Sequence, residues 1–142
     1  MAVVELAIPA RSAYLSLIRL VVDAAVAALA PGLGGARLDD LKIAVSEACA
    51  NAIEAHQGTY VEEPVVVRCI VEEERVTVEV VDRGAGFDPD RLERLPPATD
   101  PRRLRHESGL GIPLMRTLAD EVAFRRTLDG TTVALTVYRA RS

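Results

Sequence analysis

A run of β-branched residues that ends in an acidic residue and two glycines constrains this chain more than any other stretch. Residues 76–81 read Val-Thr-Val-Glu-Val-Val, which predicts a strand. The strand-favouring residues stop at Asp82, and Gly84 and Gly86 follow, so we expect Asp82 at the strand end, pointing into whatever lies beyond. Because glycine has no Cβ, the backbone there can approach a ligand closely and turn its N–H groups outward.

A second pair of glycines opens an apolar helical stretch further along the chain. Gly109, Leu110 and Gly111 lie where this helix is expected to begin. The unpaired N–H groups and the positive dipole end of a helix start suit an anion such as phosphate. Either glycine pair alone is common in plain turns, so the prediction depends on the order of an acid, a glycine pair, a long irregular segment and a glycine pair on a helix.

The irregular segment between the glycine pairs, residues 88–107, has no hydrophobic period and contains several prolines. A loop of that length inside a compact domain is usually a functional lid or disordered. Its end, residues 102–106, concentrates positive charge beside the glycines that suit phosphate. A solvated loop would also carry such charge, and only its position next to Gly109 favours a role in binding.

Composition bounds the class of protein. With 142 residues, 49% of them hydrophobic, the chain is expected to form one globular domain, residues 1–142. The net charge of −4 argues against nonspecific nucleic-acid binding, which needs an excess of Lys and Arg. No signal peptide is expected, and Asp23 and Pro31 interrupt the longest apolar stretch, so no membrane span is expected. Cys49 and Cys69 are isolated, which indicates reduced, inert thiols in a cytoplasmic protein.

The periodicity of the chain predicts an α+β fold. Strands grouped in hairpins, with helices between them, are typical of a two-layer α/β sandwich with helices on one face of a mixed sheet. The expected elements are a strand at 3–8, helices at 11–30 and from 39 or 40 to 56, a hairpin of 65–71 and 75–81, a helix at 112–118 and a hairpin of 122–128 and 131–138.

Two helices carry faces that need an explanation. The first is apolar nearly all round, with Leu17 and Leu20 lying away from its main apolar stripe. Such a helix is either deeply buried or covered by a partner, and we favour burial. On the second helix, Glu47 and Asn51 lie four residues apart and project together from the side opposite the core. Considered alone, this helix favours a solvated polar face.

Four segments together resemble the GHKL ATP-binding superfamily (gyrase, Hsp90, histidine kinase, MutL). Residues 41–53 resemble its N box, 81–87 its first glycine box, 108–115 its second glycine box, and 130–132 its terminal Gly-Thr element. Within the superfamily, the chain is most similar to the small anti-sigma-factor serine kinases of bacteria. The resemblance covers nearly the whole chain, and four boxes in order at compatible spacing are specific where one is not.

The resemblance implies a role for each matched residue. Asn51 would coordinate Mg²⁺, and Glu47 would be the base that activates a serine hydroxyl. Asp82 would accept a hydrogen bond from the adenine amino group of ATP, helped by Thr131. The remaining implied nucleotide-binding positions are Gly84, Gly86, Arg105, Gly109, Leu110 and Gly111. These roles agree with general chemistry, because Mg²⁺ prefers oxygen ligands and phosphoryl transfer depends on positioning and a carboxylate that orients the nucleophile.

The chain departs from the family pattern at two positions. Many relatives place a histidine four residues after the Asn, whereas this chain has Ala55 there and His56 next. His56 turns toward the core arc of the helix, and we assign it no role. Relatives can also carry an arginine two residues before the second glycine box, where this chain has Glu107. Arg105 is the substitute that we assign.

Three functions are compatible with these residues. The first is an ATP-dependent serine kinase that sequesters a sigma factor and phosphorylates an anti-anti-sigma protein. The second is an anti-sigma module that binds nucleotide without transferring phosphate, although Glu47 favours the kinase because a pure binder does not need it. The third, a histidine-kinase-type domain, is disfavoured because we find no phosphoacceptor helix pair before the first strand. The resemblance also implies a homodimer, and we expect neither direct nucleic-acid binding nor membrane attachment.

Overall fold

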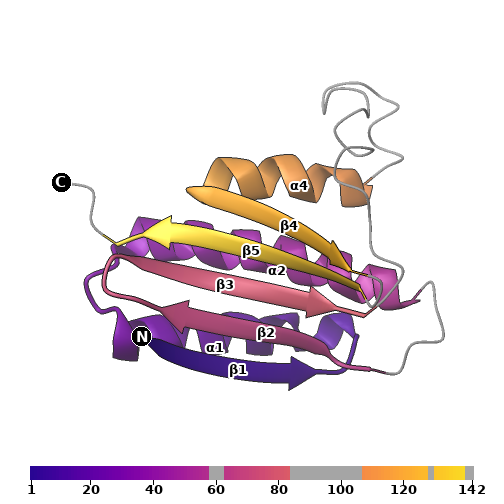
Figure 1. The fold of residues 1–142 in the computed structure, drawn as a ribbon, viewed down its shortest axis with the longest axis horizontal. Helices are drawn as coiled ribbons and strands as arrows, with labels where there is room; N and C mark the ends of the chain where they lie inside the picture. Colours follow the sequence, from indigo (N-terminus) through magenta and orange to yellow (C-terminus); the bar gives the residue numbers. More distant parts are fainter. Residues whose placement is uncertain (58–62, 84–106, 128–129, 140–142) are drawn as a thin grey trace.

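The computed structural model describes residues 1–57, 63–83, 107–127 and 130–139. Its described strands form one sheet in the order β1-β2-β3-β5-β4 (Figure 1). The strands are β1 (Ala2–Ile8), β2 (Val65–Val71), β3 (Arg75–Asp82), β4 (Glu121–Thr127) and β5 (Gly130–Tyr138).

All described neighbours in the sheet pair antiparallel, so the expectation of a mixed sheet is wrong in this detail. The reason is the position of β5. The chain crosses from β3 to β4 through a helix, which makes these two strands parallel in direction. β5 then returns beside β4 and inserts between β4 and β3, so it pairs antiparallel with both.

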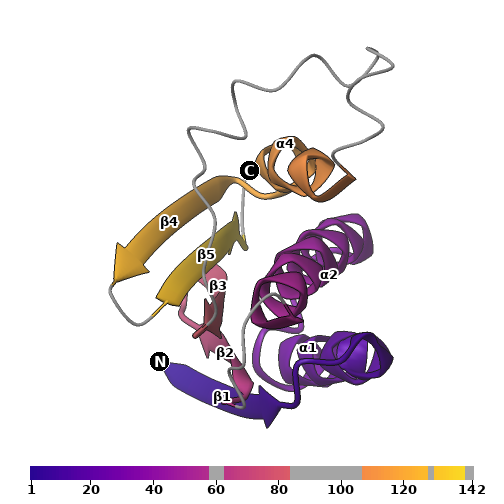
Figure 2. The same ribbon diagram turned by 90° about the vertical axis from the view of Figure 1, so that its right-hand side faces the viewer.

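The helices pack on one face of this sheet, which confirms the predicted two-layer α+β architecture (Figure 2). They are η1 (Ser12–Tyr14), α1 (Leu15–Leu29), α2 (Gly35–Gln57) and α4 (Glu107–Leu118), and α2 lies between α1 and α4. Alternate residues of β2 and β3 are buried against this layer, as the period of two in their sequences requires. The core therefore lies between the helices and the inner face of the sheet.

Helix starts are where the sequence expectations differ most from the structure. The helix α2 begins at Gly35, before the predicted start at Asp39 or Asp40. The helix α4 begins at Glu107 rather than at residue 112, so Gly109 belongs to its first turn. Pro113 therefore lies inside α4 and not in its first turn, and it has no N–H for the carbonyl group of the preceding turn.

The apolar helix α1 is buried on one side only. Ile18, Val22 and Val26 lie in the core, whereas Leu17 and Leu20 are exposed among the described residues. The predicted burial therefore holds for the inner face alone. By length and composition, residues 12–29 also pass the criteria for a membrane-crossing helix, as core helices of soluble proteins can.

Both cysteines are buried, and neither forms a disulfide bond, which agrees with the reduced thiols expected from the sequence. Burial raises the pKa of Cys49 to about 12 and that of Cys69 to about 11, because desolvation disfavours the thiolate. A thiol that stays protonated is a poor nucleophile, so the expectation that these side chains are chemically inert agrees with their environment.

The burial of α2 gives a stability prediction. Leu41 is fully buried at 0% exposure, whereas Ile43 on the same helix is 47% exposed. Leu41→Ala should lower the free energy of unfolding by about 2–5 kcal/mol, because it leaves a cavity in the core. Ile43→Ala, the control, should change it by less than about 1 kcal/mol. Urea denaturation measures both, and equal losses would contradict the packing of α2 described above.

Candidate functional site

The ends of two strands and two helices meet at one edge of the molecule. In Figure 1, β3 ends, β5 begins, α2 ends and α4 begins at the same right-hand side. Segments far apart in the sequence thus converge beyond the carboxyl end of β3. The predicted site residues that the structure describes lie on these segments.

Asp82 and Thr131 lie directly opposite each other across the β3–β5 pairing. The buried row of β3 runs through alternate residues and ends on Asp82, whose exposure is only 2%. Thr131 continues the buried row of β5, and its Oγ1 atom has no hydrogen-bond partner among the described residues. The pairing therefore brings a buried carboxylate and an available hydroxyl together, as the resemblance implied.

Gly130 allows the two strands to approach closely at this point. Its φ of 157° is a backbone conformation that L side chains rarely adopt. A Cβ at this position would overlap the backbone carbonyl oxygen of Asp82, so no larger residue fits without moving β3. In the Gly-Thr element, Gly130 thus leaves room for the Asp82 backbone, and Thr131 supplies the hydroxyl group.

Asn51 and Glu47 lie on successive turns of α2. Glu47 is half-buried, but Asn51 is only 8% exposed, so the expectation of a solvated face is wrong for Asn51. Asn51 stands two turns after the buried Ala44, and residues seven apart share one line of a helix. Because α2 packs between α1 and α4, this line lies at the edge of the core. The Asn51 Nδ2 atom has no hydrogen-bond partner in the described part of the chain.

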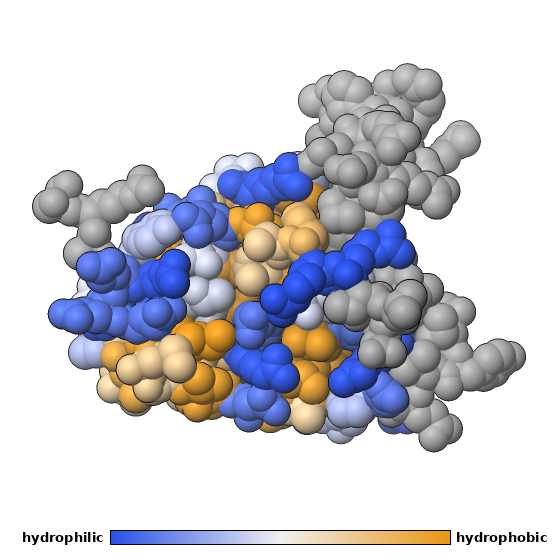
Figure 3. Space-filling view, in the orientation of Figure 1, coloured by the Kyte–Doolittle hydropathy of each residue, from blue (hydrophilic) through white to orange (hydrophobic). Residues whose placement is uncertain are grey.

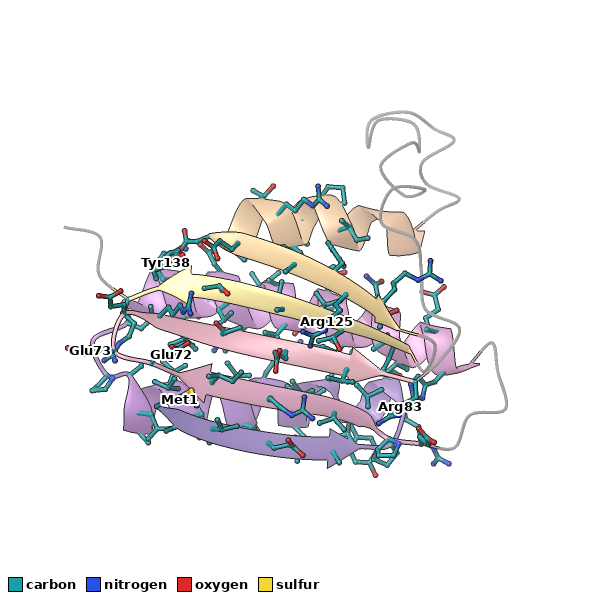
Figure 4. All side chains as sticks on the ribbon, viewed as in Figure 1. Met1, Glu72, Glu73, Arg83, Arg125 and Tyr138 are labelled. Atoms are coloured by element: carbon teal, nitrogen blue, oxygen red, sulfur yellow. The ribbon has the colours of Figure 1, made fainter. Side chains whose placement is uncertain are left out.

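His56 also lies in this region, although no role was assigned to it from the sequence. It is buried, at 3% exposure, as its helical angle predicted. Its Nε2 atom accepts a hydrogen bond from the backbone N–H of Arg83 at 2.8 Å. Figure 4 places the Arg83 side chain at the edge just beyond β3, where it pairs with Glu63 at 3.5 Å. A polar side chain turned toward the core near a helix end was the available signal, since buried polar groups need partners.

The glycine boxes are only partly described. The backbone of Gly109, Leu110 and Gly111 lies at the start of α4, on the same edge as Asp82. The first four N–H groups of a helix lack intrahelical acceptors, so this start can bind an anion. Gly84, Gly86 and Arg105 lie outside the described residues, as does the predicted lid up to residue 106.

The described groups fit a nucleotide and a hard cation. A buried carboxylate is a strong acceptor for an amino group on a purine, and the neighbouring Thr131 hydroxyl can complete the pattern. Asn51 supplies a nearly buried amide whose oxygen is a suitable Mg²⁺ ligand, and the Nδ2 donor of that amide has no partner among the described residues. Chemically, this edge can bind a purine nucleotide through its base and a cation through one protein oxygen.

Comparisons with known proteins give the same family. The histidine kinase-like ATPase domain matches residues 8–137. A Bacillus pumilus (strain SAFR-032) protein named serine-protein kinase RsbW is 39% identical over 143 residues, which cover 97% of this chain and 86% of that protein. The protein of the same name from Bacillus subtilis (strain 168) is 39% identical over 141 residues, covering 95% of this chain and 84% of that protein.

A solved structure shares the fold. The crystal structure of the RsbU and RsbW domains of Rv1364c from Mycobacterium tuberculosis matches with a TM-score of 0.69 at 20% identity. The match covers 96% of this chain and 32% of that one, so the chain corresponds to about a third of the larger protein. With the family match over most of its length and relatives of 39% identity, this chain belongs to the histidine kinase-like ATPase domain family.

Proposed function

We propose that this protein is a cytoplasmic, ATP-dependent serine kinase that sequesters a sigma factor and phosphorylates its anti-anti-sigma protein. Relatives that are 39% identical over nearly the whole chain bear the name serine-protein kinase. The observation that carries the proposal is the buried Asp82–Thr131 pair. This pair lies at the edge of the molecule where α2 ends and α4 begins. That pair matches the need of an adenine base for an acceptor in a water-poor site.

ATP supplies the transferable phosphoryl group, and Mg²⁺ neutralises phosphate charge when both are bound. In the proposed site, the Asp82 carboxylate accepts a hydrogen bond from the adenine amino group, and the Thr131 hydroxyl supports the base. Asn51 offers its amide oxygen to the cation. We assign Gly109, Leu110 and Gly111 to the phosphates, whose oxygens would bind the free N–H groups in the first turn of α4. We assign Gly84 and Gly86 to close backbone approach and Arg105 to phosphate.

Glu47 is the proposed general base. It lies one helical turn before Asn51, so a carboxylate and the cation ligand project from neighbouring positions of α2. The Glu47 carboxylate accepts the proton of the incoming serine hydroxyl and orients that oxygen toward the phosphate. A half-buried position suits this role, because the side chain is held by the helix yet remains reachable by a protein substrate.

Incubation with labelled ATP tests the kinase assignment. The substrates are candidate antagonist proteins encoded near this chain in its own genome, and each is tested with and without Mg²⁺. We expect label on a serine of one antagonist, and binding of a sigma factor in a parallel pull-down. ATP binding without transfer to any antagonist would favour the alternative function, an anti-sigma module that only binds nucleotide.

Asp82→Asn tests the adenine contact. Loss of the charged acceptor should weaken ATP binding by roughly 5–150-fold, because an unmade buried hydrogen bond costs about 1–3 kcal/mol. Asp39→Asn is the matched control, since the same change there removes an exposed carboxylate from the start of α2. Calorimetry with ATP gives the affinities, and circular dichroism verifies folding. Unchanged ATP affinity in a folded Asp82→Asn protein would remove the adenine assignment.

Substitutions of Asn51 and of Glu47 should impair different activities of the protein. Asn51→Ala should impair Mg²⁺-dependent nucleotide binding, because it removes the proposed cation ligand. Glu47→Gln keeps the size of the side chain but loses its proton-accepting power, so ATP binding should persist while phosphorylation falls by roughly 10²–10⁴-fold. Glu54→Gln is the control, because this exposed residue lies two turns further along the same line of α2. Equal phosphorylation rates for Glu47→Gln and the wild type would show that Glu47 is not the base.

We also propose that the protein is a homodimer and that the open face of the sheet contacts the second copy. No described helix covers this face (Figure 2), and hydrophobic and hydrophilic side chains alternate over it (Figure 3). Charges of alternating sign cross it: Arg68 pairs with Glu5 at 2.6 Å and with Glu79 at 3.8 Å, and Glu79 lies 4.0 Å from Arg125. Such a row on two copies related by a two-fold axis can be self-complementary.

Light scattering coupled to size-exclusion chromatography tests this interface. The wild type should have the mass of two chains. Arg68→Glu makes three neighbouring side chains acidic and should give a monomer, because like charges would then face each other. Arg11→Glu makes the same charge change at an exposed position outside the sheet and should remain dimeric. A monomeric wild type, or a dimeric Arg68→Glu variant, would exclude this arrangement.

A further inference from the structure

The hydrogen bond between His56 and Arg83 joins two segments that the site depends on. His56 lies in the last turn of α2, and Arg83 is the first residue after β3. The Arg83 N–H donates to the His56 Nε2 atom at 2.8 Å, and the imidazole is almost completely buried. The contact therefore fixes the end of β3 to the helix that carries Asn51.

The N–H group in this bond belongs to the peptide unit that begins at Asp82. A peptide unit is planar, so holding the Arg83 N–H also holds the Asp82 carbonyl group. On the β5 side, Gly130 lies so close to that carbonyl oxygen that a Cβ would overlap it. The peptide unit is thus held by His56 from the helix layer and limited by Gly130 from the neighbouring strand. Both contacts restrict the direction in which the Asp82 side chain leaves the backbone.

The bond sets a chemical requirement on His56. An acceptor Nε2 needs its lone pair, so the imidazole must be neutral with its proton on Nδ1. A residue of similar size without an acceptor would leave the part-buried Arg83 N–H without this partner. The Arg83 peptide would then turn to find another partner, and Asp82 would move with it.

We propose that His56 is a positioning residue that aligns Asp82 for recognition of the adenine base and thereby sets the preference for ATP over GTP. The inference rests on the proposed adenine contact of Asp82. Adenine presents an amino donor where guanine presents a carbonyl acceptor, so a fixed carboxylate attracts the first and repels the second. Selectivity of this kind depends on a rigid acceptor, because a mobile carboxylate can move away from the guanine oxygen.

Two substitutions of His56 test this role. His56→Phe keeps a planar ring but has no acceptor, whereas His56→Gln can place an amide oxygen near the position of Nε2. Calorimetry with ATP and with GTP should show that His56→Phe lowers the ATP affinity about tenfold. The ratio of ATP affinity to GTP affinity should also fall. His56→Gln should recover most of both. Val26→Ala, a cavity variant in the buried part of α1, controls for lost stability and should leave the ratio unchanged.

The outcomes separate this inference from the proposed function. A wild type that binds ATP and GTP equally would overturn the adenine contact of Asp82 and the role of His56 together. A selective wild type with an equally selective His56→Phe variant would overturn the role of His56 alone, as would a His56→Gln variant no better than His56→Phe.

A measurement on the wild type covers the case in which His56→Phe does not fold. In ¹⁵N-labelled protein, a nitrogen–nitrogen coupling across the hydrogen bond should connect the Arg83 amide with His56 Nε2, and the Arg83 amide should exchange slowly with solvent. A coupling that persists with ATP bound supports the positioning role. An absent coupling together with a rapidly exchanging Arg83 amide would overturn it.

Discussion

The antiparallel pairing of β3 with β5 is the constraint on which the rest of the site depends. Its register places Asp82 opposite Thr131, and both continue the buried rows of their strands. A one-residue slip of β5 against β3 would turn Thr131 to the open face of the sheet and separate it from Asp82, because side chains alternate along a strand. Gly130 keeps the two backbones close enough for this pairing. Core packing of the strands and the position of the polar pair therefore have the same cause.

The helix α2 makes the second contribution, because one rigid element carries groups with three different tasks. Glu47 and Asn51 occupy successive turns, and His56 at its end accepts the hydrogen bond from Arg83. Packing of Leu41 and its neighbours into the core fixes the helix against the sheet. In the proposed mechanism, cation binding and proton acceptance come from the helix and base recognition from the sheet. The His56–Arg83 bond is a polar connection between the two layers close to the site.

Periodicity was sufficient to predict the two-layer architecture and the hairpins, and the glycines that follow β3 were sufficient to place Asp82 at a strand end. The mixed sheet was wrong, because the insertion of β5 between β3 and β4 is a long-range arrangement that local patterns do not specify. Asn51 was assigned to a solvated face because one helix considered alone has only a core side and a solvent side. In the structure, α4 packs beside α2, so a residue outside the predicted core side of α2 can still be buried, as Asn51 is. His56 was correctly placed toward the core, but its acceptor role depends on a backbone N–H that is distant in sequence.

We propose that this edge of the molecule binds ATP through Asp82 and a cation through Asn51. A crystal structure of the protein with Mg²⁺ and a non-hydrolysable ATP analogue tests it most directly. We expect the adenine amino group within hydrogen-bonding distance of the Asp82 carboxylate, with Mg²⁺ on the Asn51 side-chain oxygen and phosphates at the start of α4. A nucleotide bound elsewhere, or with its base turned away from Asp82, would show that this edge is not the proposed ATP site.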